Sequence, residues 1–166
     1  WCKKVDILSA RRRKILQQYA AAHPEQASKA LEKIKRARQL LYQFFSVIAT
    51  GDMNALSGDL LHKFNTALSD SLSHIRFTVN STAIVPDWQE DDTDLLLPLR
   101  IVMKSAYDVL TGEDHQRIKE CPACGWIFLD QTKNNKRRWC NPLSCGSIEK
   151  SKKYYQKKKQ EISTHT

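Results

Sequence analysis

Four cysteines in the last third of the chain have the spacing of a metal site. Cys121 and Cys124 form a C-x2-C pair, and Cys140 and Cys145 form a C-x4-C pair after fifteen intervening residues. Each close pair lets two sulfurs bind one ion. The fifteen residues between the pairs are enough for the chain to fold back and bring the second pair to the same ion. We therefore predict that these four thiolates bind one tetrahedral Zn²⁺ ion. Four sulfur ligands leave no open coordination position, so the ion should be structural.

Basic residues are concentrated around these cysteines. Residues 117–166 contain 12 Lys and Arg against 4 Asp and Glu, whereas residues 1–116 contain 15 against 14. Such a local excess, in a chain of net charge +9, is typical of a surface that contacts nucleic acid. The candidate nucleic-acid-binding residues are Lys133, Lys136, Arg137, Arg138, Lys150, Lys152, Lys153 and Lys157. The alternative is a solvated charged surface, above all for the Lys-rich tail at 157–159.

The segment that carries the cysteines reads as a treble-clef-like zinc finger. Pro122 and Gly125 favour a tight turn that points backbone N–H groups at sulfur. After this turn we expect a strand at 126–130, a polar turn at 131–136 and a returning strand at 137–140. A terminal helix should then begin at Cys145, with Ser147 as its cap.

The elements before the finger are mostly helical. Apolar residues at helical spacing predict helices over 10–22, from Pro24 to Gly51, and over 56–73. Alternation over 75–79, followed by a turn and apolar residues at 83–85, predicts a β-hairpin. Acidic residues at 90–92 precede a last helix that ends at Gly112. The fold class is α+β, mostly helical, with a helical domain at 1–116, the finger at 117–159 and a tail at 160–166.

Several function classes lack support in the sequence. No apolar run reaches the ~18 residues of a membrane span. No Gly-rich phosphate loop, nucleophile elbow or metalloprotease motif is present, so we expect no enzyme. The chain opens at Trp1 without an initiating Met or a signal-like segment, which indicates a fragment of a longer protein. Paired cysteines without a signal favour metal binding in a reducing compartment, and hence a cytoplasmic protein with Cys2 as a free thiol.

The finger also resembles a known family. The runs Cys-Pro-Ala-Cys-Gly-Trp-Ile-Phe-Leu-Asp, Arg-Arg-Trp-Cys and Cys-Gly are similar to the CGNR zinc finger of bacterial stress-induced transcription regulators. In that family the finger follows a regulatory ABATE domain, which residues 1–116 resemble. The resemblance implies zinc on the four cysteines and a DNA-binding finger. It departs from the family at Ser147 and Ile148, which stand where the family has Asn-Arg; Ile148 cannot replace the polar contacts of an Arg.

Together these features predict a DNA-binding transcription regulator that contacts double-stranded DNA. Its N-terminal domain would sense an unidentified small-molecule effector or form a homodimer, since two-fold proteins fit palindromic sites. One alternative is an RNA- or ribosome-associated module, because Trp and Tyr beside basic residues can stack on unpaired bases. Another alternative is a protein-interaction adaptor, in which zinc only shapes the docking surface.

Overall fold

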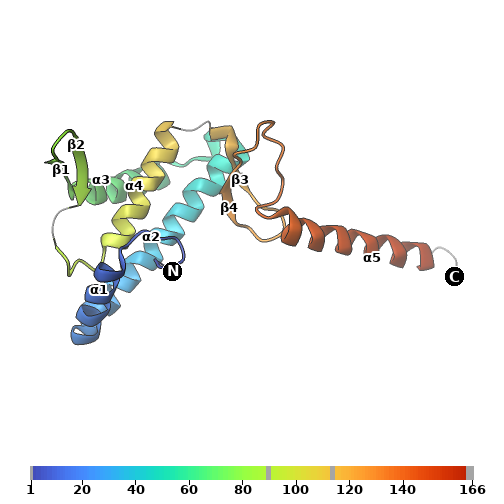
Figure 1. Cartoon of the computed structure of the whole chain (residues 1–166). Helices are drawn as coiled ribbons and strands as arrows, with labels where there is room; N and C mark the ends of the chain where they lie inside the picture. The colour runs from blue at the N-terminus through green and yellow to red at the C-terminus, as the bar shows by residue number, and fades with distance from the viewer. Residues whose placement is uncertain (1, 89–90, 113–114, 164–166) are drawn as a thin grey trace. The chain divides into compact units, whose positions relative to one another are not determined.

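A computed structural model describes the backbone of residues 2–88, 91–112 and 115–163, with side chains up to residue 156 and at residue 160. Within these ranges the chain forms five α-helices and two two-stranded antiparallel sheets (Figure 1). The predicted mostly helical architecture with a small hairpin is confirmed. No helix in the described ranges combines the length and hydrophobicity needed to cross a bilayer.

The chain divides into two compact units. Unit 1 consists of Trp1–Phe44 and Ser57–Glu113, and unit 2 consists of Phe45–Leu56 and Asp114–Thr166. The long second helix contributes residues to both units, because the division falls within its last two turns.

The first two helices have the predicted limits. Helix α1 (Ala10–Ala22) begins after Ser9, whose Oγ accepts a hydrogen bond from the amide of Arg12 at 3.2 Å. Helix α2 (Pro24–Thr50) starts with Pro24, where a missing N–H leaves no intrahelical bond unmade. It ends before Gly51, which has a φ of 77° that glycine adopts without strain.

Helix α3 and the first hairpin complete much of unit 1. Helix α3 (Gly58–Leu72) follows the short turn η1 (Met53–Ala55), and Ser57 caps it. Phe64 of α3 stacks on Phe44 of α2, with ring centroids 3.9 Å apart, and both rings are buried. Strands β1 (Ile75–Val79) and β2 (Ile84–Trp88) pair with Val79 opposite Ile84, as the alternation predicted.

Helix α4 (Leu97–Gly112) begins later than the acidic residues at 91 and 92. Asp91 accepts hydrogen bonds from the amide and hydroxyl of Thr93, and Asp92 pairs with Arg12 at 2.8 Å. These acids therefore hold the preceding loop instead of capping the helix. Glu90 lies outside the described residues. Leu97 joins Leu8 and Leu16 in a buried cluster, against which the half-buried Cys2, Ile7, Trp88, Leu95 and Ile101 pack.

Unit 2 contains the second hairpin and the terminal helix. After η2 (His115–Arg117), strand β3 (Ile118–Glu120) pairs with β4 (Ile127–Leu129), with Ile118 opposite Leu129. The expected returning strand at 137–140 is wrong, since β4 pairs with the strand before the cysteines. The amide of Arg137 donates to the Asp130 carboxylate at 2.8 Å, so it is unavailable to a strand ladder.

The start of the terminal helix differs from the prediction, because a π-helical turn precedes it. A short π-helical turn, η3 (Pro142–Gly146), leads directly into α5 (Ser147–Ser163). The expected cap at Ser147 is wrong, because this residue already has helical φ and ψ of −68° and −41°. Asn141 is the cap: its Oδ1 accepts hydrogen bonds from the amides of Leu143 and Ser144 at 2.9 and 3.2 Å.

Candidate metal centre

The four cysteines that the spacing singled out meet at one point in unit 2. Cys121 and Cys124 lie in the turn between β3 and β4, Cys140 lies in the loop before η3, and Cys145 lies within η3. Their sulfurs all lie within 4.8 Å of one another, and the Cys124–Cys140 and Cys140–Cys145 pairs are 3.6 Å apart. A tetrahedron with metal–sulfur bonds of ~2.3 Å has edges of about 3.8 Å. The cluster therefore fits a single metal ion.

The same distances exclude disulfides within the cluster. A disulfide holds its sulfurs about 2.05 Å apart, and all four thiols are free. The fifth cysteine, Cys2, is also free, and it lies in unit 1.

A tight turn positions the first pair of cysteines. The amides of Gly125 and Cys124 both donate to the carbonyl of Cys121, at 2.8 and 3.3 Å, and the amide of Cys121 donates to the Trp126 carbonyl at 2.9 Å. Gly125 has a φ of 70°, in the left-handed region that favours glycine. This confirms the conformation that the sequence predicted for Gly125.

A close approach between Trp139 and Gly146 accompanies the second pair. Gly146 is buried, and a Cβ atom added to it would lie 3.5 Å from the Trp139 ring. The indole therefore packs over Gly146, and an added Cβ would meet the ring at an ordinary van der Waals distance. Cys145 precedes Gly146 in η3, and the Asn141 cap fixes this turn.

The cysteine thiols of the cluster differ in how readily they ionise. Burial opposes ionisation of Cys121, but amide donors at Cys140, Ala123 and Cys124 overcome this and lower its pKa to about 6. Burial and hydrogen bonds with the other thiols raise the pKa of Cys140 to about 12. Cys145 hydrogen-bonds Cys140, yet burial and the Cys121 charge leave its pKa raised. A divalent cation relieves this conflict, and its binding to such thiols releases protons.

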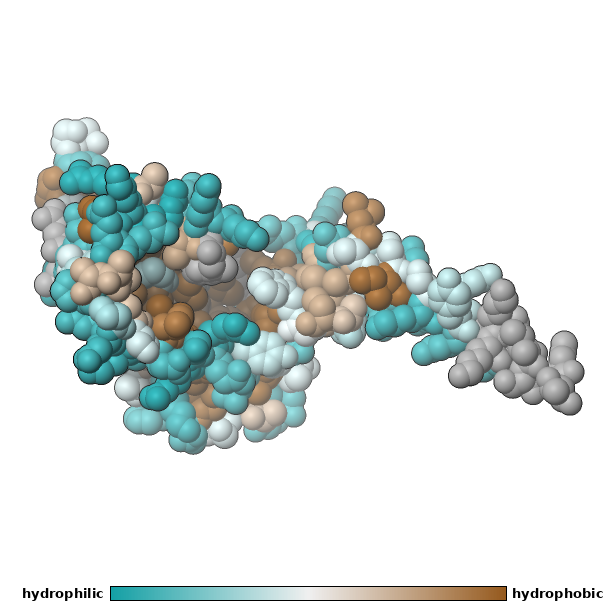
Figure 2. Space-filling view, turned by 90° about the horizontal axis from the view of Figure 1, so that it is seen from below, coloured by the Kyte–Doolittle hydropathy of each residue, from teal (hydrophilic) through white to brown (hydrophobic). Residues whose placement is uncertain are grey.

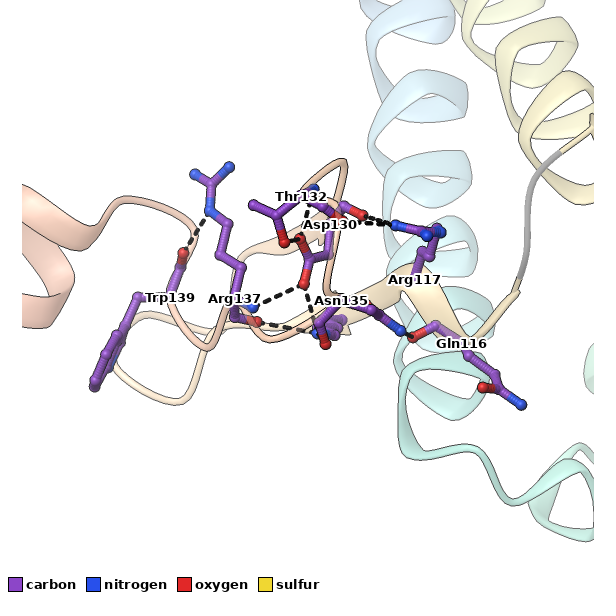
Figure 3. A network of polar contacts seen from close by, with 8 residues as sticks. Gln116, Arg117, Asp130, Thr132, Asn135, Arg137 and Trp139 are labelled. Atoms are coloured by element: carbon purple, nitrogen blue, oxygen red, sulfur yellow. Dashed lines mark hydrogen bonds and ion pairs between the residues drawn. The ribbon is translucent and has the colours of Figure 1, made fainter.

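A buried carboxylate organises the loop between the two cysteine pairs (Figure 3). Asp130 is fully buried, and its Oδ1 accepts hydrogen bonds from the Thr132 amide at 3.0 Å and the Thr132 hydroxyl at 2.6 Å. Its Oδ2 accepts from Lys119 Nζ at 2.7 Å and from the Arg137 amide at 2.8 Å. Burial alone would raise the pKa of Asp130, but these bonds hold that pKa well below its usual range.

Two inward-facing cations extend the same network to the loop backbone. Lys119 Nζ also donates to the carbonyls of Asn135 and Arg137, at 2.7 and 3.2 Å. Arg117 donates to the carbonyls of Asp130 and Thr132, both at 3.0 Å. Sequence reasoning missed Asp130, Lys119 and Arg117. The one available signal was that Asp130 is the sole acid between Cys121 and Ile148.

The predicted nucleic-acid-binding residues have different environments. Lys133, Lys136, Lys150 and Lys153 are exposed, and no hydrogen bond or ion pair engages them within the described part of the chain. Arg138 is also exposed, and its guanidinium lies 5.4 Å from the Trp139 ring centroid. Lys152 pairs with Glu149 at 3.1 Å, and Arg137 is half-buried. The Lys157 side chain lies outside the described residues.

Arg137 is tied to the metal-binding segment. Its Nε donates to the Trp139 carbonyl at 2.9 Å, and one terminal nitrogen donates to the Cys140 carbonyl. Its guanidinium also lies 5.3 Å from the centroid of the Phe128 ring. The side chain that the sequence assigned to nucleic acid therefore has a structural role as well.

The comparisons with known proteins agree with the metal centre. Residues 117–158 match the family model of the CGNR zinc finger, which confirms the predicted resemblance for this segment. No curated protein and no solved structure matched the chain. The resemblance of residues 1–116 to an ABATE domain stays a prediction.

Proposed function

We propose that this protein is a DNA-binding transcription regulator in which a structural Zn²⁺ ion on the four cysteines holds a basic surface against the DNA backbone. The observation that carries the proposal is the charge of the segment around the second cysteine pair. Residues 131–148 contain four Lys and Arg and no acid, and the charge of the preceding Asp130 is committed to Lys119. This positive charge is left to an external polyanion.

Zinc is the metal that best suits the donors. Four cysteine sulfurs at tetrahedral spacing are typical of structural zinc, and a closed ligand set leaves no position for substrate. The match to a zinc finger family supports the same choice. A cysteine-bearing turn comes first, and η3 with its cysteine then leads into the terminal helix, which is compatible with a treble clef. The hairpin differs from the predicted arrangement, because it encloses the first cysteine pair instead of following it.

Helix α5 supplies a second basic surface. Its described side chains from Ser151 to Gln156 are all exposed, so no face of this stretch packs on the rest of unit 2. On the face seen in Figure 2, brown side chains gather near the start of α5, and teal and white ones follow along it. A helix with Lys150 and Lys153 one turn apart can lie along phosphates or enter a groove.

The proposal predicts salt-dependent binding of the zinc-loaded full chain to duplex DNA. Fluorescence anisotropy of a labelled duplex between 50 and 200 mM salt should show a linear fall of log K with log salt. Each neutralised phosphate contributes a slope of about −0.9. Zinc removal with a chelator should abolish the binding, and re-addition of zinc should restore it. A binding constant that does not change with salt concentration would contradict the proposal.

Exposed aromatic side chains favour single-stranded RNA as a second candidate. Trp126, Tyr154 and Tyr155 are 65%, 63% and 69% exposed. Aromatic rings at such exposure can stack on unpaired bases. Competition for the labelled duplex separates the candidates: unlabelled single-stranded RNA that displaces the protein at lower concentration than unlabelled duplex would favour RNA.

The adaptor alternative makes the opposite prediction for the basic residues. Charge reversal at Arg138 and Lys150 should leave an adaptor's nucleic-acid behaviour unchanged, whereas a DNA-binding finger should lose affinity. Arg137 is unsuitable for this comparison, because its side chain also holds the Cys140 segment.

Unit 1 would supply the regulation, by sensing an effector or by forming a homodimer. A depression in this unit supports the sensing role. Its lining includes the buried Leu8 and Leu97 and the Arg12–Asp92 ion pair. It also includes Arg11, an exposed cation that no ion pair engages within the described part of the chain. An apolar floor beside a cation suits a small apolar anion.

A further inference from the structure

We infer that the loop between the two cysteine pairs forms a seat for one phosphate group, which in the proposed function is a phosphate of the DNA backbone. The inference rests on the proposed function for the source of the phosphate. It assigns the main anchoring contact to this loop, and it makes Asp130 and Lys119 positioning residues that shape the seat.

The seat is a shallow depression with a purely cationic charge. It is lined by Thr132, Lys133, Asn134, Lys136, Arg137 and Pro142. Three of these residues are cations and none is an acid. Lys133 and Lys136 are exposed, and no hydrogen bond or ion pair holds either side chain within the described part of the chain. Converging Lys and Arg side chains with no counter-charge are the donors that bind phosphate oxygens.

The backbone of the seat is fixed before any ligand arrives. The carbonyls of Thr132, Asn135 and Arg137, whose oxygens would repel an anion, accept hydrogen bonds from Arg117 or Lys119. The side-chain amide of Asn135 donates to the Gln116 carbonyl at 3.2 Å, and Asn135 has a φ of 49° that asparagine tolerates. Figure 3 shows Asp130 and its partners inside the loop. Preorganisation of this kind reduces the entropy lost on binding.

Arg137 gives the seat a rigid cation. Its guanidinium is held by the carbonyls of Trp139 and Cys140 and lies over the Phe128 ring. Little side-chain freedom remains to be lost when a phosphate binds. The Cys140 carbonyl also belongs to a predicted metal ligand, so the position of this guanidinium depends on the metal centre.

A pair of double variants tests the seat in the zinc-loaded full chain. Lys133→Gln with Lys136→Gln removes two cations from the depression. Lys29→Gln with Lys33→Gln removes two exposed lysines of α2 and changes the net charge equally. We expect the first variant to make the slope of log K against log salt shallower by about 0.9, because the seat holds one phosphate and each lost phosphate contact removes about that much. Between 50 and 200 mM salt, the affinity of this variant should therefore fall by a factor that is roughly three- to fourfold smaller than the factor for the wild type. The control should keep the wild-type slope.

Inorganic phosphate distinguishes a backbone phosphate from a free one. It is titrated at constant ionic strength, and amide NMR signals of residues 132–137 report its binding. A backbone seat should bind free phosphate weakly, with small shifts confined to this loop that disappear in the Lys133→Gln, Lys136→Gln variant. Tight phosphate binding together with an unchanged salt slope in that variant would overturn the backbone assignment.

The remaining outcomes separate the seat from the proposed function. If the two double variants bind DNA alike, with equal zinc content and intact amide spectra, the seat is wrong although DNA binding stands. If the wild-type chain binds no duplex DNA, the proposed function fails. The phosphate titration then decides alone: shifts at residues 132–137 support the seat, and their absence overturns it.

Discussion

Asp130 shows how one buried carboxylate can convert a flexible basic loop into a defined surface. Its two oxygens accept four hydrogen bonds from Lys119, Thr132 and Arg137, so the charge is both neutralised and fully bonded. A buried charge without such partners would strongly destabilise the fold. The cations on the outside of the loop thereby keep their charge for a ligand.

We expect Asp130→Asn to weaken DNA binding without loss of the metal. The amide is similar in size to the carboxylate but carries no charge, so Lys119 loses its counter-ion and the loop loosens. Melting temperature should fall, and the salt slope for duplex DNA should become shallower. Zinc stoichiometry, measured with a chromophoric chelator, should stay at one ion per chain. An unchanged salt slope with a lowered melting temperature would show that Asp130 has only a structural role.

A second prediction at the residue scale concerns Gly125. The φ of 70° is unfavourable for a residue with a Cβ, so Gly125→Ala should destabilise unit 2 by about 1 kcal/mol. Gly112→Ala is the matched control, because Gly112 has no positive φ and, outside its own helix turn, no atom of the described residues lies within 4 Å of the added Cβ. Chemical denaturation followed by Trp fluorescence measures both. Equal effects of the two substitutions would contradict the strain argument.

The sequence predicted individual residues well where spacing alone defines the chemistry. The four cysteines are recognisable because metal ligands must be close in sequence or returned by a short loop. Asp130 and Lys119 are eleven residues apart, and nothing in their spacing distinguishes a buried pair from two surface charges. Arg137 was assigned to nucleic acid for the same reason, since its bonds to the carbonyls of Trp139 and Cys140 depend on the folded loop.

At the scale of elements, helices were easier to predict than the pairing of short strands. Ser9, Pro24 and Gly51 are local signals, and they mark helix limits that the structure confirms. The partner of β4 could not be read from local pattern, because β3 is three residues long and precedes the cysteines. Residues 137–140 have an equally suitable local pattern, but in the folded loop the Arg137 amide donates to Asp130.

The start of the terminal helix gives a prediction with an internal control. Asn141→Ala removes the oxygen that accepts the amides of Leu143 and Ser144, and should destabilise unit 2 by about 1 kcal/mol. Ser147→Ala should change stability by only a few tenths of a kcal/mol, because Ser147 lies inside the helix. Thermal melts of both variants in excess zinc test this. A larger loss at Ser147 would restore the cap that the sequence predicted.

At the scale of the whole molecule, metal removal should affect the two units differently. Among its described residues, unit 2 has few buried apolar side chains, chiefly Ile48 and Ile118, whereas unit 1 has stacked Phe44 and Phe64 and the Leu8 cluster. Small zinc modules depend on the metal for roughly 10–16 kcal/mol of folding free energy. On chelation, NMR amide dispersion should collapse for residues 117–156 and persist in α1, α3 and α4. Loss of all dispersed signals together would contradict independent stability.

The division between inward and outward cations in the loop has an evolutionary consequence. Arg117 and Lys119 hold the loop carbonyls, so their replacement disturbs the scaffold. Lys133 and Lys136 are exposed, and no hydrogen bond or ion pair joins their side chains to the scaffold within the described part of the chain. Mutations at these two positions can therefore retune affinity for a ligand while the frame stays folded, and selection can adapt the surface in small, tolerated steps.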